Sequence, residues 1–156
     1  MEIDKADIRI INTLQENART SLEQLAYITG LSSATVQRRV KALRDSGVIL
    51  REIAVVDPDK VGQRMSFVIM VELERERLDQ IDIFVRRVVK EPQVQQCYYV
   101  TGEADFCLIC MARDMEEFEE MTHRLFFEDT NVRRFRTSVV MGRKKVGLGV
   151  FLGGAN

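Results

Sequence analysis

The sequence has little of what several protein classes require. Its 156 residues include three cysteines, one histidine, two prolines and no tryptophan. Three cysteines are too few, and an odd number, for the disulfide framework of a small secreted domain. No apolar stretch reaches the roughly 18 residues of a membrane-spanning helix, and the charged start MEIDKADIR does not resemble a signal peptide. These absences favour a cytoplasmic protein with no membrane partner.

The net charge of −1 excludes a globally basic protein but conceals a local cluster. Between Ser32 and Arg51, five basic residues stand against one acid. Only the local face matters when a protein binds a polyanion. The composition, with 46% hydrophobic and 30% charged residues, is otherwise that of a folded domain.

The first fifty residues predict three short helices. Asp4 is a good N-cap for the first, and Ser21 begins the S-x-x-Q pattern of a capping box for the second. Gly30 suits the left-handed end of that helix, and Ser32 caps the third. Two helices joined by so short a turn, the second basic on its outer side, indicate a helix-turn-helix domain over residues 1–50.

The third helix carries the functional signal. Val36, Val40 and Leu43 recur at helical spacing and should face the core. On the opposite side, small residues allow close approach to a groove, glutamine and arginine can pair with base edges, and basic residues can reach phosphates. For one helix alone, a solvated polar face is the simpler interpretation, but the three-helix context favours double-stranded DNA as the partner. The predicted DNA-contacting residues are Ser33, Ala34, Gln37, Arg38, Arg39 and Lys41.

A different pattern follows a predicted linker strand over residues 51–64. Residues 65–156 read as strands and amphipathic helices in the order βαββαβ, which predicts a ferredoxin-like domain and an α+β fold class. Leu78 and Met115 are placed on the inward faces of the two helices. One face of the sheet would stay apolar and uncovered, so we expect it to pack against another copy of the chain. The sequence VGLGVFL near the end suggests a further edge strand.

The stretch TGEADFCLIC contains two competing signals. Cys107 and Cys110 form a C-x-x-C pair, but in a strand they point to opposite faces with Cα atoms about 10 Å apart, too far for a disulfide. Gly102 and Asp105 lie in a turn that either holds a ligand or simply reverses the chain. His123 has no nucleophile or carboxylate constellation around it. We therefore expect no catalytic residue and no metal site.

Taken together, these segments resemble the leucine-responsive/asparagine-regulator (Lrp/AsnC) family of transcription factors. The pieces that carry the resemblance are DKADIRIINTLQENART, LAYITGLSSATVQRRVKALRDSGVI, TGEADFCL and RTSVVM, in this order. The resemblance implies a winged helix-turn-helix domain followed by a ferredoxin-like effector and oligomerisation domain. It also implies a homodimer, often assembled into an octamer, with no cofactor and with an amino acid or related metabolite as effector.

The resemblance also places the effector between subunits, at the turn between the second and third strands and at the fourth strand of a neighbour. Met115 and Phe127 match further apolar positions near that site. Where the family often has an aromatic residue in RTSVVM, this chain has Ser138, so the effector need not be leucine. The start of the recognition helix, SSAT, lacks the family's usual prolines. The implied effector residues are Thr101, Gly102, Asp105, Ser138, Val139 and Val140.

Two alternatives remain. Some proteins similar to this family are sirohaem decarboxylases with a histidine near the second-to-third strand turn, and TGEADFCL has none, which argues against an enzyme. The other alternative is an architectural DNA-binding protein that keeps the helix-turn-helix and the assembly but binds no small molecule.

Overall fold

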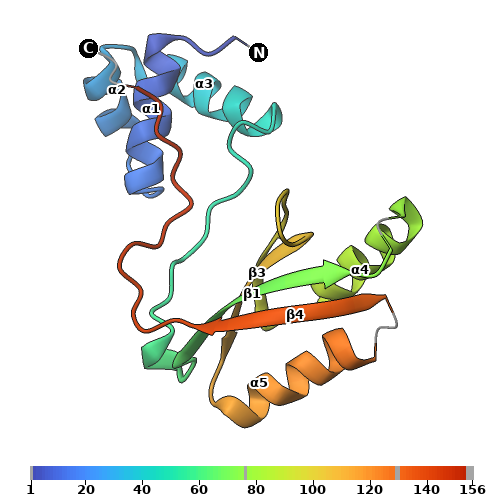
Figure 1. Ribbon diagram of the computed structural model, residues 1–156. Helices are drawn as coiled ribbons and strands as arrows, with labels where there is room; N and C mark the ends of the chain where they lie inside the picture. Colours follow the sequence, from blue (N-terminus) through green and yellow to red (C-terminus); the bar gives the residue numbers. More distant parts are fainter. Residues whose placement is uncertain (1, 76, 129–130, 154–156) are drawn as a thin grey trace. The chain divides into compact units, whose positions relative to one another are not determined.

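The computed structural model describes residues 2–75, 77–128 and 131–153. The chain forms two compact units, both visible in Figure 1. One contains the residues up to Val55 together with the segment from Lys145 onwards, and the other contains Val56–Lys144. The sequence had assigned all of residues 65–156 to the second domain. In the structure, the segment from Lys145 onwards packs with the helical unit.

The helical unit has the three predicted helices, α1 (Lys5–Glu16), α2 (Leu22–Thr29) and α3 (Ser33–Asp45). Their predicted ends are confirmed. Asp4, Ser21 and Ser32 each accept a hydrogen bond from a backbone N–H of the following turn, and Gly30 has a φ of 72° in the left-handed region. Capping of this kind contributes about 1 kcal/mol per helix.

Apolar side chains from all three helices meet in one small core. The residues with no more than 1% exposure are Ile10, Leu25, Val36 and Leu43. Burying each such side chain stabilises the unit by about 1.5–3 kcal/mol. The predicted inward face of α3 is therefore correct, and its opposite face is free for another role.

The predicted linker strand over residues 51–64 does not form. Residues 50–57 have no regular secondary structure, and a 3₁₀ turn, Asp59–Val61, follows. The side chains of Leu50 and Val55 are 88% and 90% exposed, so no neighbouring strand satisfies this backbone or covers these side chains. VGLGVFL is not a strand either. Apolar residues alone do not make a strand without a partner.

The second unit has the predicted βαββαβ order. Its four strands form one antiparallel sheet in the order β2-β3-β1-β4, which is the ferredoxin-like arrangement. A π-helical turn, His123–Phe127, directly follows the second helix of this unit, Met115–Thr122. The elements are β1 (Met65–Leu73), α4 (Leu78–Lys90), β2 (Val94–Tyr99), β3 (Phe106–Ala112), α5 (Met115–Thr122) and β4 (Val132–Val139).

Both helices cover the same face of this sheet. Phe67 of β1 stacks on Phe118 of α5 with ring centroids 3.9 Å apart, and Phe84 of α4 lies 4.8 Å from Phe106 of β3. Two inward predictions were wrong. Leu78 is 81% exposed and Met115 is 44% exposed. Each is the first residue of its helix, where the chain has not yet turned onto the sheet.

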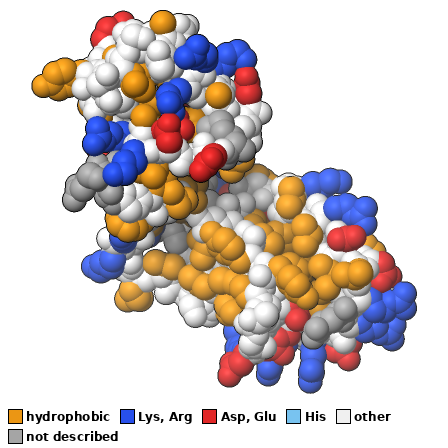
Figure 2. Space-filling view, turned by 90° about the horizontal axis from the view of Figure 1, so that it is seen from above, with side chains coloured by type: hydrophobic (Ala, Val, Ile, Leu, Met, Phe, Trp, Pro, Cys, Tyr) orange, Lys and Arg blue, Asp and Glu red, His pale blue; other side chains and the backbone are white. Residues whose placement is uncertain are grey.

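The other face of the sheet is apolar and is not covered by α4 or α5. Val68 pairs with Ile109 and Met70 pairs with Cys107, and these residues alternate along the strands with the buried core positions. All four are only half-buried. Figure 2 shows hydrophobic side chains gathered on the sheet-bearing unit, with charged side chains at the margin.

Candidate DNA-binding and effector sites

The face of α3 that points away from the helical core carries the residues predicted to contact DNA. Ala34, Gln37, Arg38 and Lys41 are exposed, and Ser33 is half-buried at the start of the helix. Gln37 and Arg38 have no ion pair or side-chain hydrogen bond with any residue in the described ranges. The two side chains best suited to reading base edges are therefore available.

Arg39 is placed differently from the expectation. Its Nη1 atom lies 2.8 Å from Oδ2 of Asp4 and 2.9 Å from Oδ1 of Asp7, so the guanidinium joins α3 to the start of α1. The hydrogen bond to Asp7, followed in importance by the one to Asp4, raises the pKa of Arg39. Its charge is already balanced by two carboxylates, which favours a structural role over contact with a phosphate.

The Asp4 carboxyl responds to this arrangement. The Asp7 backbone N–H and the Arg39 guanidinium hydrogen-bond to it and hold its pKa below the usual 3.8. A lowered carboxyl pKa in the folded state stabilises the fold above the unfolded-state pKa, and this stabilisation is lost as the pH falls through the folded-state value. The link between α1 and α3 should therefore weaken only below about pH 4.

Two further basic residues near the end of α3 are also paired. Lys41 forms an ion pair with Asp45 one turn later, and Arg44 forms one with Glu52. The side chains of the first pair are 74% and 62% exposed, and such surface pairs contribute only about 0–1 kcal/mol. Lys41 can therefore exchange Asp45 for a phosphate at little cost, whereas Arg39 would have to leave two carboxylates.

The turn predicted to hold the effector connects β2 to β3. Gly102 has a φ of 118°, a conformation that strains any L-amino acid with a side chain, although a β-carbon there would meet no atom within 4 Å. Thr101 is exposed and Asp105 is half-buried. The predicted turn is confirmed, and its glycine is required by the backbone whether or not a ligand binds.

Asp105 fastens this turn to the end of β1. Its Oδ2 atom accepts a hydrogen bond of 2.7 Å from the Leu73 backbone N–H, and its own N–H donates to the Val71 carbonyl at 2.9 Å. The bond from Leu73 lies where the pairing of β1 with β4 shifts by one residue. One carboxylate oxygen of Asp105 thus completes the sheet, and Oδ1 is left for a further partner.

The fourth-strand residues lie at the other end of the sheet. Ser138 pairs with Val68 and Val139 pairs with Phe67, while the Val140 N–H donates to the Ser66 carbonyl at 2.9 Å. Leu73, to which Asp105 is bonded, is five residues further along β1, or about 16 Å at the strand rise. One chain therefore does not bring the turn and the fourth-strand residues together.

Comparison with known proteins decides what this architecture is. The Lrp/AsnC ligand binding domain matches residues 66–149, which is more than half of the chain. The chain belongs to the Lrp/AsnC family. A winged helix-turn-helix DNA-binding domain matches residues 3–49, which are the three helices described above.

Transcription regulators match this Lrp/AsnC chain along nearly its whole length. The HTH-type transcriptional regulator y4tD of Sinorhizobium fredii is 46% identical over 93% of this chain and 86% of its own length. The transcriptional regulator AzlB of Bacillus subtilis is 31% identical over 92% and 91%. The chain is accordingly a DNA-binding transcription regulator with a ligand-binding domain, and not an enzyme.

A solved structure gives the same result for the fold. The complex of the transcriptional regulator NMB0573 from Neisseria meningitidis with L-Met superposes with a TM-score of 0.88 at 30% identity, covering 96% of each chain. The fold of this Lrp/AsnC chain is thus shared with a regulator that was solved in complex with an amino acid.

The three cysteines of the Lrp/AsnC domain differ in burial. All three are free, and Cys110 is fully buried on the helix-covered face while Cys107 is half-buried on the other. Burial raises the pKa of Cys110 to about 12, so it stays protonated and unreactive at neutral pH. No cluster of three or more potential metal ligands occurs in the described residues, nor does a helix long and apolar enough to cross a membrane.

Sequence analysis missed an ion-pair network beside the effector turn. Arg136 of β4 lies 3.4 Å from Glu103 in the turn and 3.4 Å from Glu72 of β1, and Arg134 binds the same Glu72 at 2.7 Å. Hydrogen bonds from Arg134 lower the pKa of Glu72. Glu72 and Glu103 are each more than thirty positions from the arginines that they contact, so a local sequence pattern does not reveal that they meet.

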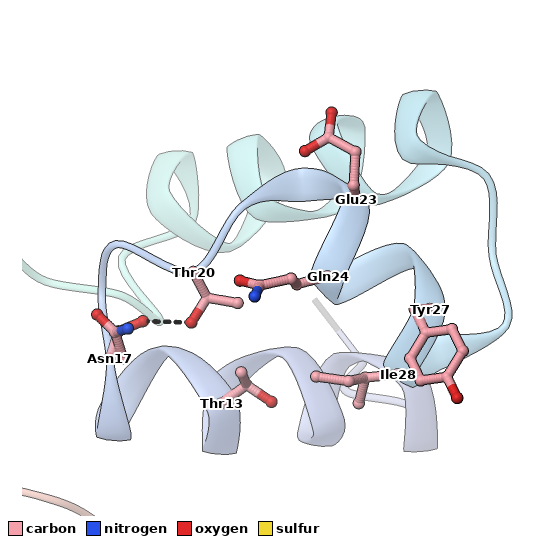
Figure 3. Close-up of a pocket in the computed structure, with 7 residues that line it drawn as sticks. All are labelled: Thr13, Asn17, Thr20, Glu23, Gln24, Tyr27 and Ile28. Atoms are coloured by element: carbon pink, nitrogen blue, oxygen red, sulfur yellow. Dashed lines mark hydrogen bonds between the residues drawn. The ribbon is translucent and has the colours of Figure 1, made fainter.

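An open depression between α1 and α2 is the other feature that the sequence did not indicate (Figure 3). The Thr20 hydroxyl donates to the Asn17 carbonyl at 2.8 Å along one side, and Tyr27 is 90% exposed at the other. Glu23 is the only charged residue among those that line it, so the lining offers no basic side chain to a DNA phosphate. Its lining residues are Thr13, Asn17, Thr20, Glu23, Gln24, Tyr27 and Ile28.

Proposed function

We propose that this chain is a cytoplasmic, sequence-specific transcription regulator that binds an amino acid or related metabolite between its subunits. The separation of the two predicted halves of the effector site supports this most strongly. The turn with Gly102 and Asp105 and the strand with Ser138 lie at opposite ends of one sheet. They can share a ligand only if the turn of one chain faces the fourth strand of another.

The uncovered sheet face supports a homodimer. Val68, Met70, Cys107 and Ile109 form its half-buried centre, and the charged network of Glu72 and its arginines lies at one edge. An apolar centre with a polar rim is the usual composition of a subunit interface. Packing this face against its own copy would remove the apolar surface from water, and further contacts between dimers would produce larger assemblies up to an octamer.

The mass of the chain in solution tests this assembly. One chain weighs 18.0 kDa, and light scattering at micromolar concentration should give twice that value or a larger even multiple. The reason is that the half-buried apolar centre of this face stays partly in contact with water in a single chain, and a second copy supplies a matching surface. A mass of one chain would contradict the assembly and, with it, an effector site between subunits.

A thermal-shift screen of the single amino acids tests the effector. A ligand at 100 times its Kd should stabilise the folded chain by about 2.7 kcal/mol. For a chain of this size, that corresponds to a rise in Tm of about 5–10 °C. L-methionine is the first candidate because the Neisseria meningitidis relative was solved with it. D-enantiomers at equal concentration provide the control for non-specific solute effects.

The architectural alternative has one observation in its favour. The Asp105 carboxylate already accepts the Leu73 N–H, so the turn has a structural reason for its acid. An architectural protein would bind DNA and assemble but show no shift with any amino acid. The same screen therefore separates the two functions, and a hit that also changes DNA affinity would exclude the alternative.

A further inference from the structure

The C-terminal segment after β4 is bonded to the first helix of the DNA-binding unit. The side-chain amide of Gln15 on α1 donates to the Val150 carbonyl at 3.0 Å, and its Oε1 accepts the Val150 N–H at 2.6 Å. Leu152 packs against the helical core two residues later. Figure 1 shows this segment running past α1. A single glutamine thus holds both polar backbone groups of one residue in the segment.

The start of the same segment is held in the sheet-bearing unit. Arg143 lies 2.9 Å from Asp59 in the 3₁₀ turn, and its side chain is only 22% exposed. The six residues between Arg143 and Val150 include Gly147, where a β-carbon would meet no atom within 4 Å. The segment is therefore fixed at two points with an unpacked stretch between them.

The segment is also continuous with the strand assigned to the effector. Only three residues separate Val139, the last residue of β4, from Arg143. A shift of the Ser138–Val140 backbone would reach Arg143 and then Val150 directly along the chain. The linker over residues 51–64 is the other covalent connection to the helical unit, so each chain joins its two units twice.

We propose that residues 145–153 form a strap that positions the helix-turn-helix unit and carries the effect of ligand binding to it. This inference rests on the proposed function, since it takes Ser138–Val140 as the effector strand. The attachment at Gln15 suits a switch because the side chain is exposed and its two hydrogen bonds exchange readily with water. A restrained unit binds DNA more tightly because less orientational freedom is lost on binding.

The test compares four full-length chains in binding to the specific DNA site at fixed salt. Gln15→Ala removes both hydrogen bonds to Val150. Insertion of six Gly/Ser residues after Gly147 keeps the attachment but adds slack. Glu16→Ala, an exposed change on the same turn of α1, is the matched control, and the wild-type chain is the reference. Fluorescence anisotropy gives the affinities with and without L-methionine, and circular dichroism and Tm confirm that each variant folds.

The strap predicts that Gln15→Ala and the insertion weaken DNA binding about fivefold or more and lose the response to L-methionine. Both should keep the Tm shift produced by L-methionine, because the effector site is untouched, and Glu16→Ala should match the wild type. If the Gln15→Ala and insertion chains bind and respond as the wild type does, the strap is disproved. If L-methionine does not shift the wild-type Tm, that result counts against this effector alone. The DNA affinities measured without ligand then test the strap, and equal affinities in all four chains would disprove it.

Discussion

Replacing Gln37 and Arg38 together with alanine is expected to weaken binding to the specific DNA site by about 30-fold or more. Each side chain is exposed on the outer face of α3 and has no competing partner in the described part of the chain. A well-placed contact to a base edge contributes about 1–3 kcal/mol of discrimination. Competition binding at fixed salt, with specific and scrambled duplexes, measures the effect.

Loss of base contacts should leave binding to scrambled DNA reduced only slightly, since Lys41 and the other basic residues predicted to contact phosphates remain. Arg19→Ala is the control of equal charge, because Arg19 is exposed in the same unit but lies outside α3. An equal loss for both duplexes would show that the outer face of α3 contributes charge and not sequence recognition.

Arg39→Ala should behave differently from Arg38→Ala. The Arg39 guanidinium bridges Asp4 and Asp7, so its removal leaves the half-buried link between α1 and α3 with two uncompensated carboxylates. The expected result is a lower Tm, with any DNA defect following from the loss of fold. This contrast between adjacent arginines is a consequence of the packing and not of their chemistry.

Substitutions at Asp105 should separate the sensing role of the turn from its structural role. In Asp105→Ala the half-buried Leu73 N–H loses its acceptor, which should lower the free energy of unfolding by about 1–3 kcal/mol. In Asp105→Asn an amide oxygen can still accept this bond, so stability should stay close to that of the wild type. Urea unfolding measures both changes.

Both Asp105 variants should lose the thermal shift with the amino acid that stabilises the wild-type chain. A carboxylate that binds an ammonium group contributes about 1.5–3 kcal/mol, so the asparagine variant should bind about 10- to 150-fold more weakly. Glu103→Gln is a matched control in the same turn, where the side chain is 88% exposed. An asparagine variant that responds as the wild type does would mean that Asp105 only holds the turn.

Local features of this chain could be predicted because they depend on residues close in sequence. Asp4, Ser21 and Ser32 cap helices through the backbone a few residues ahead, and Gly30 and Gly102 take positive φ values because they lack a β-carbon. Strand alternation alone placed Cys107 and Cys110 on opposite faces of the sheet, as the structure has them. Where no partner could be inferred, as for the linker over residues 51–64 and for VGLGVFL, the prediction of strands was wrong.

The sequence by itself determined the three N-terminal helices, the βαββαβ order of the second unit, the outer face of α3 and the turn between β2 and β3. Only the tertiary structure decided what those residues do. Helix packing placed Arg39 between the carboxylates of Asp4 and Asp7. In the sheet, one carboxylate oxygen of Asp105 accepts a hydrogen bond from β1, and Ser138 lies at the far end of the sheet from the turn. The tertiary structure also brought the backbone of Val150 into hydrogen-bond contact with the side chain of Gln15, 135 residues away. Such contacts depend on how helices pack and strands pair, and a local pattern contains no information about either.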